Sequence, residues 1–185
     1  MAKSILKYPE LNTSRLKLRE IEVADAEDIF NYASKPEVSR YLVWHPHKSV
    51  EDTYAYIDFT KKMFENREWI VLGIEFKENK KFVGTIDIRG WNSVHNCAEI
   101  GYVLSMDYWN KGIASEALRA VIGFCFDELE MNRVEAHCEE ENTASERVME
   151  KCGMKYEGAL RQKVFIKDKY RTMKMYSILK NEYHK

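Results

Sequence analysis

The order in which helical and strand-like segments follow one another restricts the fold of this chain more than any other feature of its sequence. Apolar residues recur every second position in the strand-like segments and every three to four positions in the helical ones. The predicted strands are 11–20, 69–76, 81–91, 97–104, 133–139, 155–166 and 170–179, and the predicted helices are 24–33, 49–65, 113–129 and 142–152. Because helices lie between runs of consecutive strands, the sheet should be mixed rather than purely parallel.

The length of 185 residues fits one domain, which we expect to span 1–185 because no linker-like tract divides the chain. Lys and Arg number 29 and Asp and Glu 30, a formal net charge of −1 that argues against bulk electrostatic binding to nucleic acid. Charged residues interrupt each apolar stretch before the ~18 residues that a membrane span needs, and the first residues lack an apolar export segment. We therefore expect a cytoplasmic protein with no nucleic-acid partner and no membrane partner.

The cysteine and histidine pattern gives no reason to expect a metal cofactor. No two cysteines are spaced closely enough for a zinc-binding pair, so we predict separate buried thiols. They are Cys97, Cys125, Cys138 and Cys152. His45 and His47 flank Pro46, and such a pair can bind a metal, but no third ligand accompanies it. We interpret the pair as two loop histidines.

The segment 97–118, CAEIGYVLSMDYWNKGIASEAL, joins a half-buried strand to a helix through a short loop. The small residues Gly112 and Ala114 in the first helical turn let a ligand approach the backbone closely. The N–H groups of that turn and the helix dipole favour an anion, and Lys111 adds positive charge. The segment predicts a pyrophosphate site, although a glycine there is equally compatible with a simple turn. It matches neither a dinucleotide fingerprint (GxGxxG) nor a P-loop.

With the segments around it, this stretch resembles the GNAT superfamily of acetyl-CoA-dependent N-acetyltransferases. WNKGIA at 109–114 matches the glycine and the small residue of the family's pyrophosphate motif, Gln/Arg-x-x-Gly-x-Gly/Ala, while Trp109 replaces the usual Gln or Arg. This replacement, between AEIGY and SEA, is similar to the branch that acetylates the N-termini of ribosomal proteins. Further matching segments, in order, are TSRLKLR at 13–19, VGTI at 83–86, LEMNRV at 129–134, NTAS at 142–145, CGM at 152–154 and MYSIL at 175–179.

The resemblance covers nearly the whole chain from about residue 11. It implies an α/β (α+β) domain with a mixed, mostly antiparallel sheet of six to seven strands, flanked by about four helices. It also implies acetyl-CoA as the acyl donor and an amine as the acceptor. The acceptor could be a protein N-terminus or a small molecule, because the fold does not fix the substrate. Members of the family are monomers or homodimers, and the sequence does not decide between these states.

The resemblance assigns the cofactor site residue by residue. The backbone of Tyr102, Val103 and Leu104 falls where the family binds the pantetheine arm. The residues that fall where the family's amides hold the pyrophosphate are Asn110, Lys111, Gly112, Ile113, Ala114 and Ser115. Asn142 falls on an asparagine that contacts the cofactor, although it is also a good helix N-cap, with Ser145 at the third helical position.

Acetyl transfer requires a neutral amine, a polarised thioester carbonyl and a proton for the departing sulfur. An α-amino group has a pKa of about 7.7–8.0, so a carboxylate that removes its proton accelerates the attack. Glu99 is the predicted base and shares a strand face with Gly101 and Val103, although an amphipathic strand would also turn such a residue to solvent. A backbone N–H near Val103 or Leu104 would polarise the carbonyl.

The acid that protonates the sulfur departs from the common pattern of the family. Many members carry a tyrosine where this chain has Met149, which cannot donate a proton. The ribosomal branch implies Ser145 instead, and a bound water is the alternative. No histidine is placed by sequence to activate a cysteine, so we expect direct attack in a ternary complex rather than an acyl-enzyme.

The aromatic segment around Trp44 and His47 lies between the first predicted helices. In the family this region lines the acceptor side, so both residues are candidates for substrate binding, with ordinary packing as the alternative. A second hypothesis for the whole chain is a non-catalytic module that retains coenzyme A as a sensor or interaction domain. Loss of Glu99 or Ser145 would favour that hypothesis, and the sequence retains both.

Overall fold

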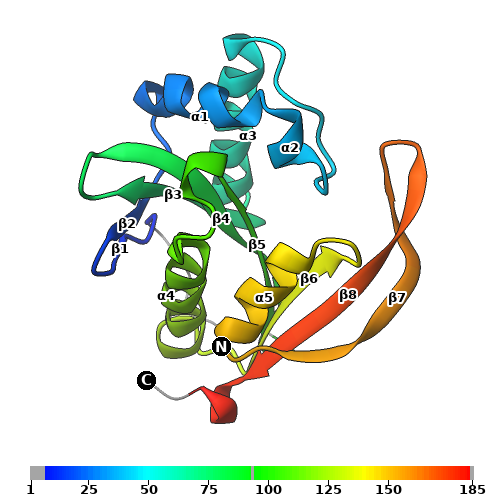
Figure 1. Ribbon diagram of the computed structural model, residues 1–185. Coiled ribbons are helices and arrows are strands. Elements are labelled where there is room, and N and C mark those ends of the chain that lie inside the picture. Colours follow the sequence, from blue (N-terminus) through cyan, green and yellow to red (C-terminus); the bar gives the residue numbers. More distant parts are fainter. Residues whose placement is uncertain (1–6, 93, 184–185) are drawn as a thin grey trace.

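The computed structural model describes residues 7–92 and 94–183, which form one eight-stranded sheet with helices packed on it (Figure 1). Residues 1–6, 93 and 184–185 of the predicted domain lie outside the described residues. The strands are β1 (Leu11–Asn12), β2 (Leu16–Arg19), β3 (Trp69–Phe76), β4 (Lys81–Asn92), β5 (Cys97–Leu104), β6 (Arg133–Glu139), β7 (Lys155–Ile166) and β8 (Lys169–Leu179). Across the sheet their order is β1-β2-β3-β4-β5-β6-β8-β7. Among the described strands, β5 and β6 form the one parallel pair.

Five α-helices within the described residues pack on this sheet. They are α1 (Ala26–Ala33), α2 (Pro36–Ser39), α3 (Val50–Glu65), α4 (Ile113–Asp127) and α5 (Thr143–Lys151). Helices α1 and α3 contact β4 and β3, while α4 contacts strands on both sides of the sheet's centre and α5 contacts β6. Helix α3 starts after Ser49, as predicted, where Ser49 and Asp52 form a reciprocal capping box.

The predicted fold class, a mixed and mostly antiparallel sheet with helices, is confirmed, and its counts of strands and helices are corrected. The predicted strand 11–20 is divided into β1 and β2, because Thr13 forms a tight turn in which its N–H donates to the carbonyl of Leu16 at 2.9 Å. The sheet therefore has eight strands rather than six to seven. The additional helix is α2, which begins with Pro36 in the first turn, where proline's fixed φ suits a helix and its missing N–H costs nothing.

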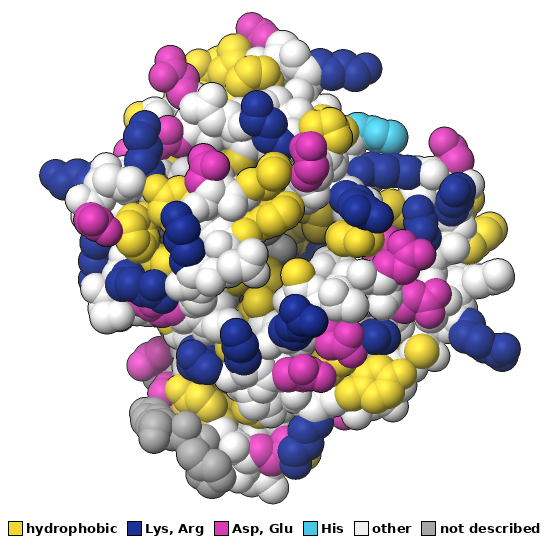
Figure 2. Space-filling view, in the orientation of Figure 1, with side chains coloured by type: hydrophobic (Ala, Val, Ile, Leu, Met, Phe, Trp, Pro, Cys, Tyr) yellow, Lys and Arg dark blue, Asp and Glu magenta, His cyan; other side chains and the backbone are white. Residues whose placement is uncertain are grey.

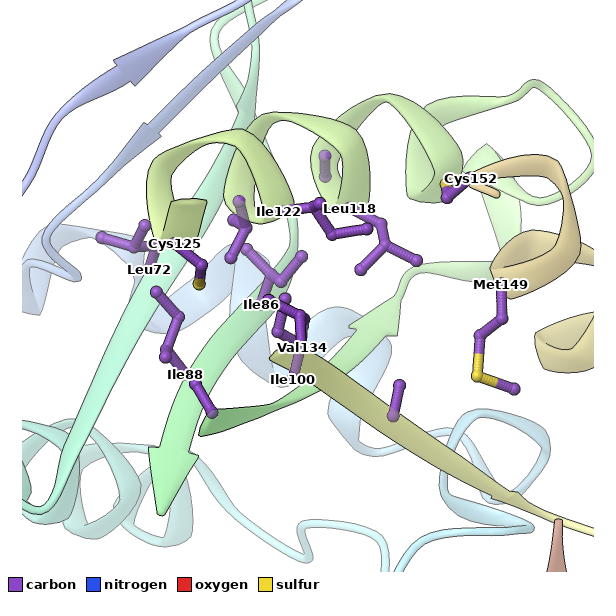
Figure 3. Packing of buried hydrophobic residues seen from close by; sticks show 14 of the residues in the cluster. Leu72, Ile86, Ile88, Ile100, Leu118, Ile122, Cys125, Val134, Met149 and Cys152 are labelled. Carbon is purple, nitrogen blue, oxygen red and sulfur yellow. The ribbon is translucent and has the colours of Figure 1, made fainter. Parts of the chain in front are cut away.

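Helix α4 organises the larger of two hydrophobic clusters (Figure 3). Leu118 and Ile122 point from α4 toward Ile86 of β4, Ile100 of β5 and Val134 of β6, and all five are at most 1% exposed. Burying a side chain of this size contributes about 1.5–3 kcal/mol. Because the cluster includes residues of both β5 and β6, it holds together the two halves of the sheet.

The second cluster covers the opposite face of the sheet. Ile29 and Tyr32 of α1 and Ile57 of α3 pack with Val71 and Phe82, which lie in β3 and β4. In β3 the neighbours of Val71 in the sequence belong to the first cluster, as the period-two geometry of a strand requires. The central strands are therefore covered on both faces, and a polar side chain on the α1–α3 face lies inside the molecule.

All four cysteines are free thiols, with Cys125, Cys138 and Cys152 buried and Cys97 partly exposed. Within the described residues, no helix is both long enough and apolar enough to cross a membrane.

Candidate active site

The sheet opens between β5 and β6. The two strands pair only over residues 97–99 and 133–135, and residues 100–104 of β5 pair on their other side with β4. Two cavities of about 400 and 410 Å³ lie at this opening. Figure 2 shows a hollow in the middle of this side of the molecule, with hydrophobic side chains inside it and Lys and Arg side chains around it. The residues that line both cavities are Tyr41, Leu42, Tyr102, Val103, Asn142 and Ser145.

The first cavity brings together most of the residues predicted to bind the cofactor. Its lining includes Tyr102, Val103, Leu104, Asn110, Gly112, Ile113, Ala114, Ser115 and Asn142. Lys111 does not line it, although its ammonium lies 5.4 Å from the centre of the ring of Tyr108, which does. Two cations that the sequence analysis missed, Arg147 and Lys151, reach the cavity from α5. Their spacing of four residues places them on one helix face, and this spacing in the sequence could have identified them as a pair.

The loop before α4 has the backbone shape that an anion cradle needs. Asn110 has φ +58° and Gly112 has φ +75°, a left-handed conformation that glycine adopts without strain. Gly112 is the N-cap of α4, so the first N–H groups of a 15-residue helix face the cavity end. The indole N–H of Trp109 donates to the carbonyl of Leu104 at 2.8 Å and ties this loop to the end of β5. That bond gives a structural reason for tryptophan at the position where the family usually has Gln or Arg.

A charged clamp from the start of the chain fixes this loop from outside. Arg15 donates through Nη1 to the carbonyl of Lys111 at 3.0 Å and through Nε to Glu116 of α4 at 2.6 Å. Glu116 also accepts hydrogen bonds from the Thr13 hydroxyl and from the backbone N–H of Arg15. Burial acts to raise the pKa of the Glu116 carboxyl, but these hydrogen bonds outweigh it and hold the pKa below its usual range. The clamp thus holds the carbonyl that precedes Gly112.

The second cavity contains a carboxylate that the sequence analysis missed. Asp87 of β4 pairs in register with Gly101 of β5, and its carboxylate lies over that glycine. A Cβ at position 101 would come within 2.8 Å of Asp87 Oδ2, so a larger residue there would displace the carboxylate. Burial raises the pKa of Asp87 to about 6, against the lowering effect of the nearby Arg89 guanidinium. The only sequence signal was polar Thr85, Asp87 and Arg89 alternating with isoleucines, which is also typical of a solvent-facing strand.

Glu99, the predicted base, lies on the predicted strand face but lines neither cavity. Its Oε1 accepts a hydrogen bond from Arg89 Nε at 2.9 Å and lies 3.3 Å from His137 Nδ1. Burial lowers the pKa of His137 in spite of the Glu99 charge, so the imidazole is neutral at pH 7. Of the two carboxylates on this face, Asp87 is therefore the one at the cavity surface, and Glu99 lies behind it as the partner of Arg89.

Ser145, the predicted acid, lies between the two cavities with a second hydroxyl beside it. The Tyr102 hydroxyl is 2.7 Å from Ser145 Oγ and donates to the Ser145 carbonyl at 3.1 Å. Burial raises the pKa of Tyr102, so it is a neutral hydroxyl at all working pH values. Asn142 caps α5 as predicted, accepting the N–H of Ser145 at 3.1 Å. Met149 is fully buried in the core.

Trp44 and His47, the predicted acceptor residues, both line the second cavity. The Trp44 and His47 rings are 5.6 Å apart, and Tyr56 of α3 follows at 6.2 Å from His47. His47 Nδ1 lies 2.8 Å from the Thr53 hydroxyl, and burial lowers the pKa of its imidazole. His47 is thus a neutral, fixed member of an aromatic wall. The described residues contain no group of three or more His, Cys, Asp or Glu side chains arranged to hold a metal ion.

Comparison with known proteins identifies the family of this chain. The family described as "Acetyltransferase (GNAT) domain" matches residues 15–155. The uncharacterized N-acetyltransferase YoaA of Bacillus subtilis is 35% identical over 173 residues, covering 94% of this chain and 98% of that protein. The ribosomal-protein-serine acetyltransferase of Escherichia coli is 30% identical over 130 residues, covering 70% of this chain and 72% of that enzyme.

Among solved structures, a GNAT-family acetyltransferase from Bacillus anthracis superposes with a TM-score of 0.83 at 29% identity, over 94% of this chain and 99% of its own. The family match spans far more than half of the sequence, and the relatives align along nearly its whole length. This protein therefore belongs to the GNAT family of N-acetyltransferases.

Proposed function

We propose that the protein transfers an acetyl group from acetyl-CoA in the first cavity to a primary amine in the second, by direct attack in a ternary complex. One observation carries this proposal: the two cavities share a wall at Tyr102, Val103 and Ser145, beside the unpaired edge of β5. A thioester that enters along the first cavity reaches an amine that enters along the second. No covalent intermediate on the protein is needed.

The first cavity supplies the contacts that a coenzyme A thioester requires. The open backbone edge at 100–104 offers hydrogen bonds to the amides of a pantetheine arm, and the N-terminal turn of α4 offers N–H groups to the pyrophosphate. Arg147 and Lys151 add positive charge from α5. Free cysteines throughout the chain are typical of a reducing compartment, so we propose that the reaction takes place in the cytoplasm.

In this reaction Asp87 is our preferred base, ahead of Glu99. The ammonium of the acceptor gives one proton to the Asp87 carboxylate, which later releases it to solvent. The neutral nitrogen attacks the carbonyl carbon, the C–N bond forms and the C–S bond breaks. The nitrogen then loses its second proton to solvent, while Ser145 donates a proton to the departing sulfur and regains one from solvent through the Tyr102 hydroxyl. A backbone N–H at the open edge of β5 polarises the carbonyl oxygen.

Acetyl-CoA mixed with the purified protein and a panel of primary amines tests the function. We expect amine-dependent release of the coenzyme A thiol, with initial-rate plots that intersect as a ternary complex requires. Thiol release no faster than hydrolysis with every amine, together with tight binding of coenzyme A, would instead identify a sensor. The Asp87 carboxylate in the second cavity favours catalysis, because a sensor needs no carboxylate at the acceptor side.

Ser145→Ala is expected to lower kcat about 10- to 100-fold, because the departing thiolate loses its nearest proton donor. Thr143→Ala, an exposed hydroxyl in the first turn of the same helix, is the matched control and should leave kcat unchanged. Steady-state kinetics at saturating acetyl-CoA measures both. An unchanged kcat for Ser145→Ala would assign the proton to water.

A further inference from the structure

The second cavity is walled mainly by aromatic rings. The rings that line it include Tyr32, Tyr41, Trp44, Tyr56, Phe59 and Trp69. Phe59 and Trp69 meet edge to face at 5.5 Å, so neighbouring rings support one another. Thr85 lies beside the hydroxyls of both Tyr32 and Tyr56, and the Tyr32 side chain is only 4% exposed. The walls thus offer a ligand ring faces and edges more than polar groups.

Most charged groups at this cavity already have a partner of opposite charge. Glu139, 3% exposed, accepts a hydrogen bond from Arg171 Nη1 at 2.8 Å. Arg89 donates to Glu99 at 2.9 Å, and its guanidinium lies 5.5 Å from the centre of the Trp69 ring. In each pair the two opposite charges neutralise each other, so neither pair attracts a further ion strongly.

Asp87 differs from these groups, because one of its carboxylate oxygens has no hydrogen-bond donor among the residues that the structure describes. Within the described residues its Oδ1 is a buried atom that accepts no hydrogen bond, although Arg89 Nε lies 3.5 Å away. The Asp87 side chain nevertheless lines the cavity and is 19% exposed. An ammonium group at this exposed part of the carboxylate would compensate its partly buried charge. The cavity therefore has one place for a positive charge, with apolar walls around the rest of the ligand.

From this arrangement we infer that the acceptor is a primary monoamine that carries an apolar group of aromatic size. The inference rests on the proposed function and narrows its substrate class. The amine can come from two sources, a free arylalkylamine or an N-terminal residue with a large apolar side chain, because both present the same chemistry to the cavity. In either case the ammonium lies at Asp87 and the apolar group lies among the rings.

The same features select against other amines of this enzyme class. A polyamine would place its further ammonium groups among Trp44, Phe59 and Trp69, without a carboxylate to pair them. An aminoglycoside would bury many hydroxyls against ring faces that offer few hydrogen-bonding groups, in a space of about 410 Å³. An amine without an apolar group would leave the walls in contact with water. Each of these substrates loses part of the binding that the cavity offers.

The test compares amines that differ in one property at a time, at fixed acetyl-CoA and pH. The pair 2-phenylethylamine and ethylamine differs in the apolar group, and spermidine adds positive charges. Burial of one phenyl group predicts a kcat/KM about 10- to 100-fold higher for 2-phenylethylamine than for ethylamine or spermidine. Short peptides with N-terminal Phe or Ser form the second arm. A Phe peptide used better than 2-phenylethylamine identifies the N-terminal source, and the reverse order identifies the free amine.

Phe59→Ala tests whether the wall causes the preference. Phe59 is 39% exposed, so its truncation should leave the fold intact, and we expect the ratio of 2-phenylethylamine to ethylamine to fall several-fold. Tyr54→Ala is the matched control, because Tyr54 lies on the same helix, is 42% exposed and lines neither cavity. In the control the ratio should stay as in the wild type.

The possible outcomes distinguish failure of the inferred substrate class from failure of the proposed acetyltransferase function. Acetylation of ethylamine or spermidine as efficient as that of 2-phenylethylamine and of the Phe peptide would overturn the substrate class and leave the acetyltransferase standing. A ratio unaffected by Phe59→Ala would likewise overturn it. Absence of amine-dependent thiol release from every substrate would overturn both. A preference for the apolar amines that Phe59→Ala reduces and Tyr54→Ala does not would establish the inference.

Discussion

Asp87→Asn is expected to lower kcat/KM for the amine by about 10²- to 10⁴-fold, because an amide cannot take the proton of the acceptor. Glu99→Gln is the matched comparison on the same strand face and should cost much less, since Glu99 lines neither cavity and is bonded to Arg89. Steady-state kinetics with 2-phenylethylamine measures both variants. A greater loss in Glu99→Gln than in Asp87→Asn would return the role of base to Glu99.

The pH profile gives this prediction a second readout. Because the pKa of Asp87 is about 6, the carboxylate is ionised above that pH, and kcat/KM should rise with pH through this region. In Asp87→Asn this rise should disappear. The Glu99 charge helps to raise the Asp87 pKa, so Glu99→Gln should move the rise to lower pH without abolishing it.

The raised pKa of Asp87 also predicts that the Asp87→Asn variant is more stable than the wild type. Its loss of activity would then not be due to misfolding. Asp87 binds its proton more tightly in the folded than in the unfolded protein, so its contribution to the free energy of unfolding is favourable at low pH and is lost as pH rises from about 4 to about 6. At pH 7 the buried carboxylate destabilises the fold by of the order of 1–3 kcal/mol. Asp87→Asn should therefore raise the Tm at pH 7, measured by calorimetry, while it removes activity.

Gly112→Val is expected to weaken acetyl-CoA binding at least about tenfold, because a β-branched residue is strained by about 1–2 kcal/mol at φ +75° and relief of that strain would displace the N–H groups of the anion cradle. Isothermal calorimetry with coenzyme A measures the Kd. Gly90→Val is the control, since Gly90 has φ +58° with open space around it and lies outside both cavities. It should show similar backbone strain with an unchanged Kd. Equal Kd values in both variants and the wild type would remove the pyrophosphate assignment.

Much of the fold could be predicted from local pattern. The strands at 69–76, 97–104 and 133–139 have the predicted bounds, because each alternates or runs apolar between clear turn residues. The loop that we propose to hold the pyrophosphate was recognisable because Gly112, Ala114 and the helix after them occur in consecutive sequence. The split at Thr13 and the short helix at Pro36 were missed, since each depends on one or two residues rather than on a repeat.

Trp44 and His47 were predicted for the second cavity and line it, but its carboxylate could not be predicted in the same way, because the residues around it meet only through the sheet. Asp87 and Glu99 both look like the polar face of an ordinary strand. The register that places Asp87 beside Gly101, and Arg89 beside Glu99, is a property of the β4–β5 ladder and is not written in either segment alone. The packing of α1 and α3 on that face then turns an apparently solvent-facing side chain into a cavity carboxylate. Tertiary structure, not local pattern, distinguishes the two acids.

The short junction between β5 and β6 has a mechanical consequence. Three residue pairs alone would join β5 and β6 only weakly, but the hydrophobic cluster under α4 includes residues of both strands and restricts their separation. The opening between the two strands is therefore formed before a ligand binds. A ligand that fits it loses few protein motions on entry, so more of its contact energy appears as affinity.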